Sequence, residues 1–366
     1  MSETAIRAAA PSESTELESI KVIALGVTVE VTGFSAPEAA EFKTAWSRCL
    51  APADSPAAAT VARIPGDFTR ANELLTSHIT LAAIDQLAGK LMMFHACGLA
   101  DPLTGATIAF IAPSGTGKTT LARTLGTGLG YVSDETVAVA TDLSIVSYPK
   151  PLSVKQSLPG APKLQEGPEQ HLLGATPDSP TLQRITLLSR SAEHGSPAVV
   201  EAVPLGMALL ELTPQLSALA RLDRGLVQLC TMIEACGGVR RVRYCEARDI
   251  TGLLPQLAKN DAGAPLEWAP LPIAPSEDSA ATGKGVRRAH VQDAIESDGA
   301  VYLLADSNLL ELGPLGGLIW DLCGDWISKE ALLQEIIATV GPHPSAATLL
   351  DEALESLLTK GVLHSA

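Results

Sequence analysis

The spacing of apolar residues along the chain predicts a mixed α/β protein. Short apolar runs, each bounded by polar or turn-forming residues, are typical of buried strands. They lie at 20–31 (a strand pair), 92–97, 107–111, 131–133, 136–140, 184–188, 198–204 and 239–244. Apolar residues recur at helical spacing over 37–50, 77–91 and 215–236. Because the strands and helices are interleaved, the pattern favours an α/β core.

The C-terminal part of the chain shows a second pattern. Residues 258–285 are dense in Ala, Pro, Gly, Ser and Asp, which is typical of an interdomain linker. After it, the pattern predicts a hairpin around Asp298 and Gly299 and then three helices, with Ser328 as the N-cap of the second. The predicted organisation is a disordered tail at 1–18, an α/β lead-in at 19–90, a core at 91–257, the linker at 258–285 and a C-terminal domain at 286–366.

Charge and composition exclude some classes of function. The formal net charge of −15 leaves no broad basic surface for nucleic acids or anionic membranes, and the basic stretches at 240–243 and 287–288 are short. Aromatic residues make up only 4% of the chain, so the core must consist mainly of Ala, Leu, Val and Ile. No apolar run approaches the ~18 residues that span a bilayer, and the N-terminus lacks the basic segment of a signal peptide. We therefore expect a cytoplasmic protein without a nucleic-acid or membrane partner.

The six cysteines and seven histidines are scattered along the chain. No two cysteines form the Cys-x-x-Cys pair that zinc sites use, and disulfides are rare in the cytoplasm. We expect most of the thiols to be free and buried. The histidines are equally dispersed and predict no metal site.

One short stretch carries most of the chemical information. Residues 111–120 read Ile-Ala-Pro-Ser-Gly-Thr-Gly-Lys-Thr-Thr, between an apolar run and a helical segment. A strand, a glycine-bearing turn and a helix in this order are typical of a P-loop, whose backbone N–H groups and helix N-terminus bind phosphates. The predicted nucleotide-binding residues are Pro113, Ser114, Gly115, Thr116, Gly117, Lys118, Thr119 and Thr120.

Two side chains of this loop have predicted roles. Lys118 can reach the β- and γ-phosphates of a nucleoside triphosphate, and the Thr119 hydroxyl can bind Mg²⁺. The loop departs from the usual pattern at Ala112, where the first glycine is expected. Alanine adds one methyl group, so the loop should form if Ala112 avoids positive φ.

Two carboxylates follow the loop at short distance. Asp134 and Glu135 stand at the end of the predicted strand 131–133. The carboxyl end of a strand beside a P-loop is where the metal and the reacting phosphate meet. Asp134 is therefore the first candidate for Mg²⁺ ligand or general base, and Glu135 the second. The alternative is that both residues begin a surface turn.

A histidine and a long irregular segment complete the candidates. His95 ends the predicted strand before the P-loop and would point towards the phosphates if that strand pairs with 107–111, although a histidine in an apolar stretch can equally be structural. Residues 156–181 are rich in Pro, Gly and Gln and predict either a lid or acceptor-binding loop, or a plain surface loop.

The segments 95–99, 114–119 and 130–135 together resemble the catalytic block of HPr kinase/phosphorylase. That family has a histidine before its P-loop, a pair of aspartates after it, and a kinase core related in fold to phosphoenolpyruvate carboxykinase. The resemblance covers 91–155 well and the rest of the core weakly. It implies ATP-dependent phosphorylation of a serine hydroxyl, with Asp134 taking the acceptor proton or binding Mg²⁺, His95 near the γ-phosphate, and Lys118 and Thr119 holding ATP and metal.

This chain departs from the family at two points. Glu135 replaces the second aspartate, and the Pro-Gly-Arg-Asn segment linked to phosphorolysis has no clear match. We therefore expect kinase chemistry without the phosphorylase reaction.

The C-terminal segment 288–364 resembles PqqD-type modules, in its Asp298-Gly299 turn and in the stretches 309–313, 319–322 and 357–363. These small winged-helix-like domains bind leader peptides of ribosomally made, modified peptides by adding the peptide as a strand to a sheet edge. The alternative is a helical module that only covers the core.

Together these patterns predict a kinase of HPr kinase type that uses ATP and Mg²⁺ and carries a C-terminal PqqD-like domain. Its acceptor would be a serine or threonine hydroxyl on a precursor peptide, held near the site by a flexibly tethered domain. Two alternatives stay open: a nucleotide-dependent peptide escort without phosphotransfer, and a kinase of a small hydroxylated metabolite. The sequence also leaves open the choice of ATP or GTP and self-association into a homo-oligomer.

Overall fold

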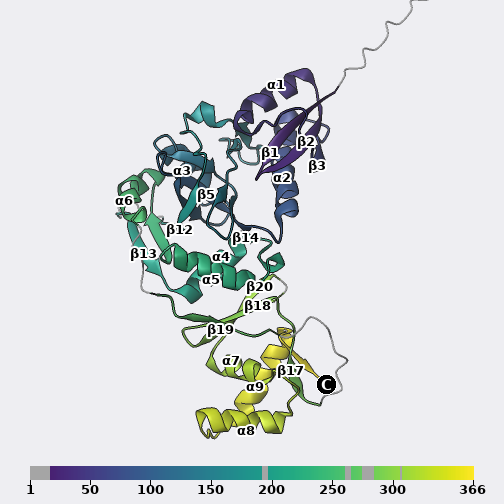
Figure 1. The fold of residues 1–366 in the computed structure, drawn as a ribbon, viewed down its shortest axis with the longest axis vertical. Coiled ribbons are helices and arrows are strands. Elements are labelled where there is room, and N and C mark those ends of the chain that lie inside the picture. The colour runs from purple at the N-terminus through teal and green to yellow at the C-terminus, as the bar shows by residue number, and fades with distance from the viewer. Residues whose placement is uncertain (1–16, 192–196, 260–264, 274–283, 306) are drawn as a thin grey trace, which may run out of the picture. The chain divides into compact units, whose positions relative to one another are not determined.

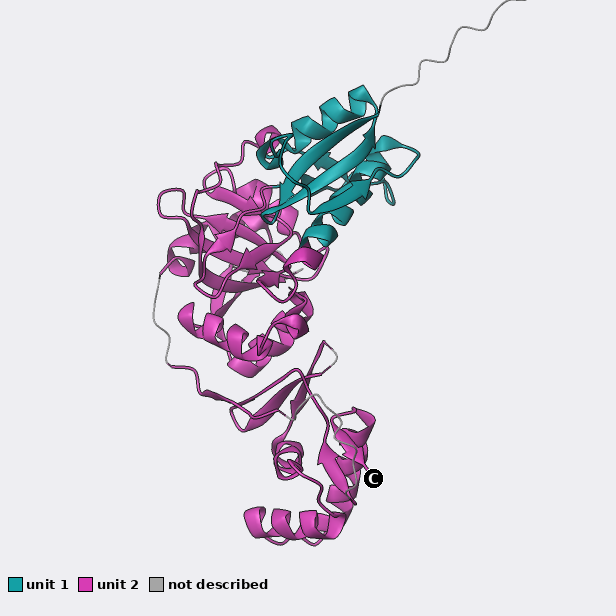
Figure 2. Cartoon of the chain, turned by 45° about the vertical axis from the view of Figure 1, so that its right-hand side comes forward, with its two compact units in different colours: residues 1–83, 150–168 teal, residues 84–149, 169–366 magenta. Residues whose placement is uncertain are grey.

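The computed structural model describes residues 17–191, 197–259, 265–273, 284–305 and 307–366. The chain is mixed α/β with several sheets, which confirms the predicted class (Figure 1). It divides into two compact units, Met1–Ala83 with Lys150–Pro168, and Ile84–Pro149 with Glu169–Ala366 (Figure 2). Of the tail predicted at 1–18, residues 1–16 lie outside the described residues, and Glu18 already begins a strand.

The first unit is a small sheet with two helices. Strands β1 (Glu18–Ala24), β2 (Val27–Phe34) and β3 (Ala59–Ala62) lie in that order, with β1 and β2 joined by a tight hairpin. Helix α1 (Ala36–Ala45) begins after Ser35 and is shorter than the predicted 37–50, because the 3₁₀ turn η1 (Ser47–Cys49) ends it. Helix α2 (Phe68–Leu87) starts earlier than predicted and lies mostly in this unit.

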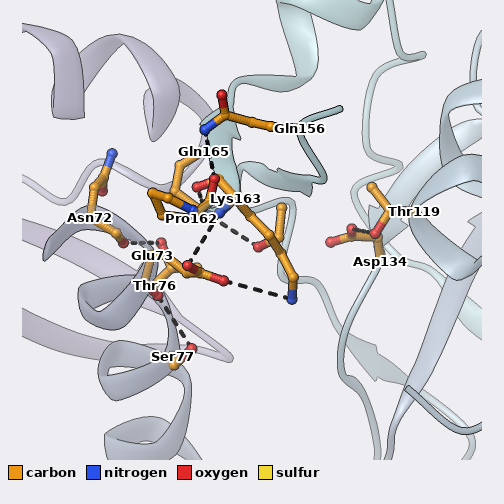
Figure 3. A network of polar contacts seen from close by, with 11 residues as sticks. Asn72, Glu73, Thr76, Ser77, Thr119, Asp134, Gln156, Pro162, Lys163 and Gln165 are labelled. Atoms are coloured by element: carbon orange, nitrogen blue, oxygen red, sulfur yellow. Dashed lines mark hydrogen bonds and ion pairs between the residues drawn. The ribbon is translucent and has the colours of Figure 1, made fainter. Parts of the chain in front are cut away.

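The unit also takes in part of the segment 156–181, which was predicted to be irregular. Strands β10 (Leu152–Val154) and β11 (Leu164–Glu166) pair antiparallel. Between them, Lys163 contacts α2: its backbone N–H donates to Glu73 Oε2 at 3.2 Å, and its Nζ lies 3.9 Å from Glu73 Oε1 (Figure 3). Part of the predicted loop is therefore a hairpin fastened to a helix.

The second unit is built on a six-stranded sheet. Its order is β13 (Val199–Val203), β15 (Val239–Tyr244), β12 (Thr181–Arg190), β6 (Ala106–Ile111), β5 (Ala96–Ala100) and β7 (Gly130–Ser133). Strands β15, β12 and β6 are parallel, whereas β5 is antiparallel to both β6 and β7. As a result, β6, β7, β12 and β15 all end at one edge of the sheet, where parallel sheets bind ligands.

The strand predicted at 92–97 is two strands in two sheets. Residues Met92–Phe94 form β4 in a second sheet with β14 (Leu216–Ser217), β8 (Val137–Val139) and β9 (Ile145–Val146). The chain changes sheets at His95, whose N–H donates to Gln215 O at 2.7 Å. Sequence periodicity does not reveal such a break, because the residues on both sides of it are apolar and buried.

Helices cover this sheet at several points. They are α3 (Lys118–Leu125), α4 (Leu205–Leu212), α5 (Gly225–Ala235) and α6 (Leu254–Leu257), with the 3₁₀ turns η2 (Pro168–His171), η3 (Thr213–Gln215), η4 (Leu219–Arg221) and η5 (Ala247–Leu253). The helix predicted at 215–236 begins only at Gly225, because β14, η4 and the left-handed residue Arg224 (φ 52°) precede it. None of the helices within the described residues has the length and apolar character that crossing a membrane requires.

The C-terminal domain has a four-stranded antiparallel sheet and three helices. The sheet order is β16 (Trp268–Pro270), β18 (Asp293–Ser297), β19 (Ala300–Ala305) and β20 (Asn308–Leu312). The helices are α7 (Pro314–Leu322), α8 (Lys329–Val340) and α9 (Ala346–Thr359), and β17 (Val286–Arg288) pairs with β21 (Leu363–Ser365). Strand β16 lies inside the predicted linker 258–285, of which 260–264 and 274–283 are outside the described residues.

This sheet is packed against the core on one face. Ile295, Tyr302 and Leu304 share an apolar cluster with residues of α4 and α5, whereas α7–α9 pack on the other face. The Tyr302 hydroxyl lies so close to Gly206 on α4 that a Cβ there would be 1.9 Å from it. In the described structure the C-terminal sheet therefore packs on the core, whereas the flexibility expected of the tether is not tested, because residues 260–264 and 274–283 lie outside the described residues.

The six cysteines are free and buried, as predicted. Burial raises the pKa of Cys230 and Cys236 to about 12 and that of Cys323 to about 11. Because the thiolate is the reactive form, we expect at most about one thiol of the folded protein to react with Ellman's reagent within minutes at pH 8. All of them should react after denaturation. Fast reaction of several thiols in the folded state would contradict the buried arrangement.

Candidate functional site

The predicted P-loop connects β6 to α3. The chain leaves β6 at Ile111 and enters α3 at Lys118. Gly115 and Gly117 have φ values of 89° and 113°, which other residues rarely adopt. A Cβ built on either glycine meets no atom within 4 Å, so the loop needs glycine for its backbone conformation, and its surface there is open.

Ala112, the departure from the usual loop pattern, fits without strain. It is 1% exposed and is not among the residues with positive φ. The condition stated from the sequence is therefore met. Thr116 closes the turn behind it, since its N–H and hydroxyl both donate to the Pro113 carbonyl, at 3.4 and 3.0 Å.

Lys118 lies inside the loop. Its side chain is only 7% exposed, and its Nζ donates to the carbonyl oxygens of Ala112 and, at 3.2 Å, Pro113. Burial lowers its pKa to about 8, against the opposing charges of Asp134 and Glu135. An ammonium group held among carbonyl oxygens beside an open glycine turn is available to phosphate oxygens.

Asp134 meets the loop from the other side. It follows β7, is 4% exposed, and accepts a hydrogen bond at Oδ2 from the Thr119 hydroxyl at 2.9 Å (Figure 3). The predicted approach of Thr119 and Asp134 is therefore present, and Asp134 does not begin a surface turn. A contact that the sequence did not predict holds the second carboxylate oxygen: the Tyr131 hydroxyl donates to Asp134 Oδ1 at 3.1 Å.

Glu135 and His95 lie beside this pair. The backbone N–H of Ala96, next to His95, donates to Glu135 O at 3.0 Å. Burial lowers the pKa of the half-buried His95, the charge of Lys118 lowers it further, and the carboxylates of Glu135 and Asp134 act in the opposite direction. The strand before His95, β4, pairs with β8 and β14 and not with 107–111, so the predicted place of His95 near the phosphates stays a prediction.

The edge of the sheet contributes further groups that the sequence did not reveal. The Tyr244 hydroxyl, at the end of β15, lies 3.5 Å from Thr116 O. At the end of β12, Arg190 donates through Nε to Cys245 O at 2.9 Å, and its Nη2 lies 3.4 Å from Glu246 Oε1. These residues could have been found only by knowing that β12 and β15 run parallel to β6.

The residues present fit a magnesium nucleotide. The described residues contain no group of three or more His, Cys, Asp or Glu side chains able to hold a metal by themselves. Magnesium bound with a nucleotide takes most of its oxygen ligands from phosphates and water and needs only one or two protein groups. The Thr119 hydroxyl and the Asp134 carboxylate, 2.9 Å apart at the mouth of the loop, are oxygen donors of the kind it prefers.

Comparisons with known proteins add no further assignment. No protein-family model matches the chain, and no curated protein matches it in sequence. The functional argument therefore rests on the geometry of the loop and of the residues around it.

Proposed function

We propose that this protein is an ATP-dependent kinase that uses Mg²⁺ and phosphorylates a serine or threonine hydroxyl, with a precursor peptide as the acceptor. The observation that carries the proposal is the joint placement of an open glycine turn, the buried Lys118 and the Thr119–Asp134 pair at one edge of the sheet. Phosphoryl transfer depends mostly on positioning and on neutralising charge, and these groups supply both.

Each group has a defined task in this proposal. The backbone N–H groups of 114–118 and the N-terminus of α3 would bind the phosphates, and Lys118 would neutralise charge on the β- and γ-phosphates. Bound Mg²⁺ supplies further charge neutralisation, and Thr119 and Asp134 are the residues that would hold it. Asp134 is also the first candidate to take the acceptor proton, with Glu135 second, and His95 stands near the γ-phosphate.

The architecture of the C-terminal domain supports the peptide part of the proposal. A PqqD-like module binds peptide as an added strand, which needs a free sheet edge. Strand β16 covers the β18 edge, whereas β20 ends the sheet, with no strand paired to its outer side in the described part of the chain. A peptide on β20 would therefore extend a sheet that is already formed.

The position of β20 also suits delivery of the acceptor. Strand β20 contacts η3, and Gln215 at the end of η3 accepts the hydrogen bond from His95 N–H. A peptide bound to β20 would thus pass from the C-terminal domain to η3, whose last residue is hydrogen-bonded to His95. Holding the acceptor there raises its effective concentration at the phosphate site.

The proposal predicts a specific loss on Asp134→Asn. With γ-labelled ATP and serine-bearing candidate peptides, the wild type should transfer label, and Asp134→Asn should transfer it at least about 100-fold more slowly, because both of its proposed roles require the charged carboxylate. Asp142→Asn, at an exposed turn where Asp142 accepts from Ser144, is the matched control and should retain transfer.

Other outcomes distinguish the alternatives. Tight ATP binding with nucleotide-dependent peptide affinity, but no phosphorylated product by mass spectrometry, would favour the escort protein. Transfer to a small hydroxylated metabolite in the absence of any peptide would favour the metabolite kinase. Transfer that persists in Asp134→Asn would remove Asp134 from the mechanism.

A further inference from the structure

Tyr131 is a buried residue whose polar end lies in the candidate site. Its side chain is fully buried in β7, and its hydroxyl is 3.1 Å from Asp134 Oδ1. The Thr119 hydroxyl, from α3, takes the other oxygen, Oδ2, at 2.9 Å. The carboxylate is therefore held at both oxygens by hydroxyl donors from two different elements.

The backbone around Tyr131 is fixed on both sides. Its N–H donates to Gly174 O at 3.3 Å, and its carbonyl accepts from the Thr176 hydroxyl at 2.6 Å. Across the strand it pairs with Leu99 on β5. Because the ring is enclosed and the backbone is bonded, the hydroxyl is a rigid donor, whereas Asp134 lies just past the end of β7 in a bend.

We infer that Tyr131 is a positioning residue: it fixes the Asp134 carboxylate so that Oδ2 faces Thr119, where the metal of a magnesium nucleotide would be held. The inference rests on the proposed function and deepens it. Tyr131 itself touches neither nucleotide nor acceptor and acts through Asp134. A carboxylate already held in one orientation loses less conformational freedom when the metal binds, so the tyrosine strengthens metal-dependent binding.

The test separates metal-dependent from metal-independent nucleotide binding. The affinity for ATP is measured by calorimetry with excess Mg²⁺ and again with EDTA, and the ratio of the two dissociation constants is the metal-dependent gain. For Tyr131→Phe we expect the gain to fall about tenfold, the effect of one hydrogen bond to a charged group. The affinity in EDTA should stay within about twofold, because the loop that binds the phosphates is unchanged.

A matched control accounts for the loss of a buried hydroxyl as such. Tyr302 is also buried, and its hydroxyl donates to the Glu311 carboxylate at 3.2 Å, in the C-terminal domain. Tyr302→Phe should lower the melting temperature by a similar amount and leave the metal-dependent gain at the wild-type value. Phenylalanine keeps the ring in both variants, so the packing of both is preserved.

A double-mutant cycle with Asp134→Asn shows through which residue Tyr131 acts. In the Asp134→Asn background, Tyr131→Phe should change the metal-dependent gain no further, since its partner charge is gone. An additive effect, an unchanged gain in Tyr131→Phe alone, or an equal loss with and without Mg²⁺ would each overturn the inference. A wild type that binds no ATP would overturn the proposed function instead, which keeps the two failures distinguishable.

Discussion

Replacing Lys118 with methionine is expected to weaken ATP binding about 30-fold or more. In the proposed complex the buried Lys118 ammonium contacts phosphate oxygens at the glycine turn, and removing one partner of a buried charge pair costs about 2–5 kcal/mol. Methionine is close to lysine in length and is apolar, so the fold should persist. Calorimetric titration of ATP into wild type and variant measures the loss.

The same substitution that weakens ATP binding should not lower the free energy of unfolding. The pKa of Lys118 is about 8 in the folded protein against an ordinary 10.5, so the folded state disfavours the charged form. The unfolded chain then binds more protons between these two values, and the wild type gains stability as the pH rises from 8 to 10.5. The methionine variant should lack this gain. At pH 7 its free energy of unfolding, measured in urea, should be at least as high as that of the wild type.

Lys155→Met is the matched control, because Lys155 is exposed and lies outside the loop. It should bind ATP like the wild type. If Lys118→Met bound ATP as tightly as Lys155→Met, then Lys118 would not contact the phosphates.

The geometry of the candidate site could largely be predicted because its parts are local in sequence. The residues from 112 to 119 are consecutive, and glycine at 115 and 117 permits the positive φ values found there. Asp134 could be placed because it directly follows a short strand, and the ends of parallel strands meet at one edge. The Thr119–Asp134 hydrogen bond is the direct consequence.

The residues that surround this site could not be predicted in the same way. Tyr244 reaches the loop, and Arg190 lies at the same edge of the sheet, only because β15 and β12 lie parallel to β6, and the apolar pattern of a strand does not encode its direction or its neighbour. Tyr131 was recognised as a strand residue, but its hydroxyl contact depends on where the strand ends. The break at His95 was missed for a similar reason, since β4 and β5 are both apolar.

The C-terminal domain shows the same limit. The turn at Asp298 and Gly299 was predicted correctly, with φ values of 51° and 72° that suit a tight hairpin. Strand β16 was missed because three residues, Trp268–Pro270, carry no periodicity and lie in a segment whose composition is that of a linker. Composition describes what a segment can do alone, whereas β16 is a strand because β18 pairs with it.

Asp293→Ala is expected to lower the free energy of unfolding by about 3–5 kcal/mol, the cost of removing one partner from a buried ion pair. Asp293 is fully buried at the start of β18, and its Oδ1 lies 2.7 Å from Arg224 Nε. Its Oδ2 accepts from Val227 N–H at 3.0 Å, in the first turn of α5. One carboxylate of the C-terminal sheet thus caps a core helix and neutralises the arginine that precedes it.

The variant leaves the helix N–H group and the buried Arg224 Nε without their carboxylate, although the arginine side chain as a whole is 30% exposed, which is why the effect should be large. Asp293→Asn keeps the volume and one acceptor oxygen and should lose about half as much. Asp321→Ala, at an exposed position on α7, is the control and should stay within about 0.5 kcal/mol. Urea unfolding followed by circular dichroism measures all three.

The number of steps in the unfolding transition shows whether the C-terminal domain stays docked on the core. Because the C-terminal sheet and α5 share one apolar cluster, the wild type should unfold these parts in one step. In Asp293→Ala the C-terminal domain should separate first, which would appear as an early transition and as faster proteolysis between 258 and 285. If peptide phosphorylation then falls while ATP affinity stays unchanged, delivery of the acceptor depends on docking. An unchanged single transition would instead show that the apolar cluster alone holds the domain in place.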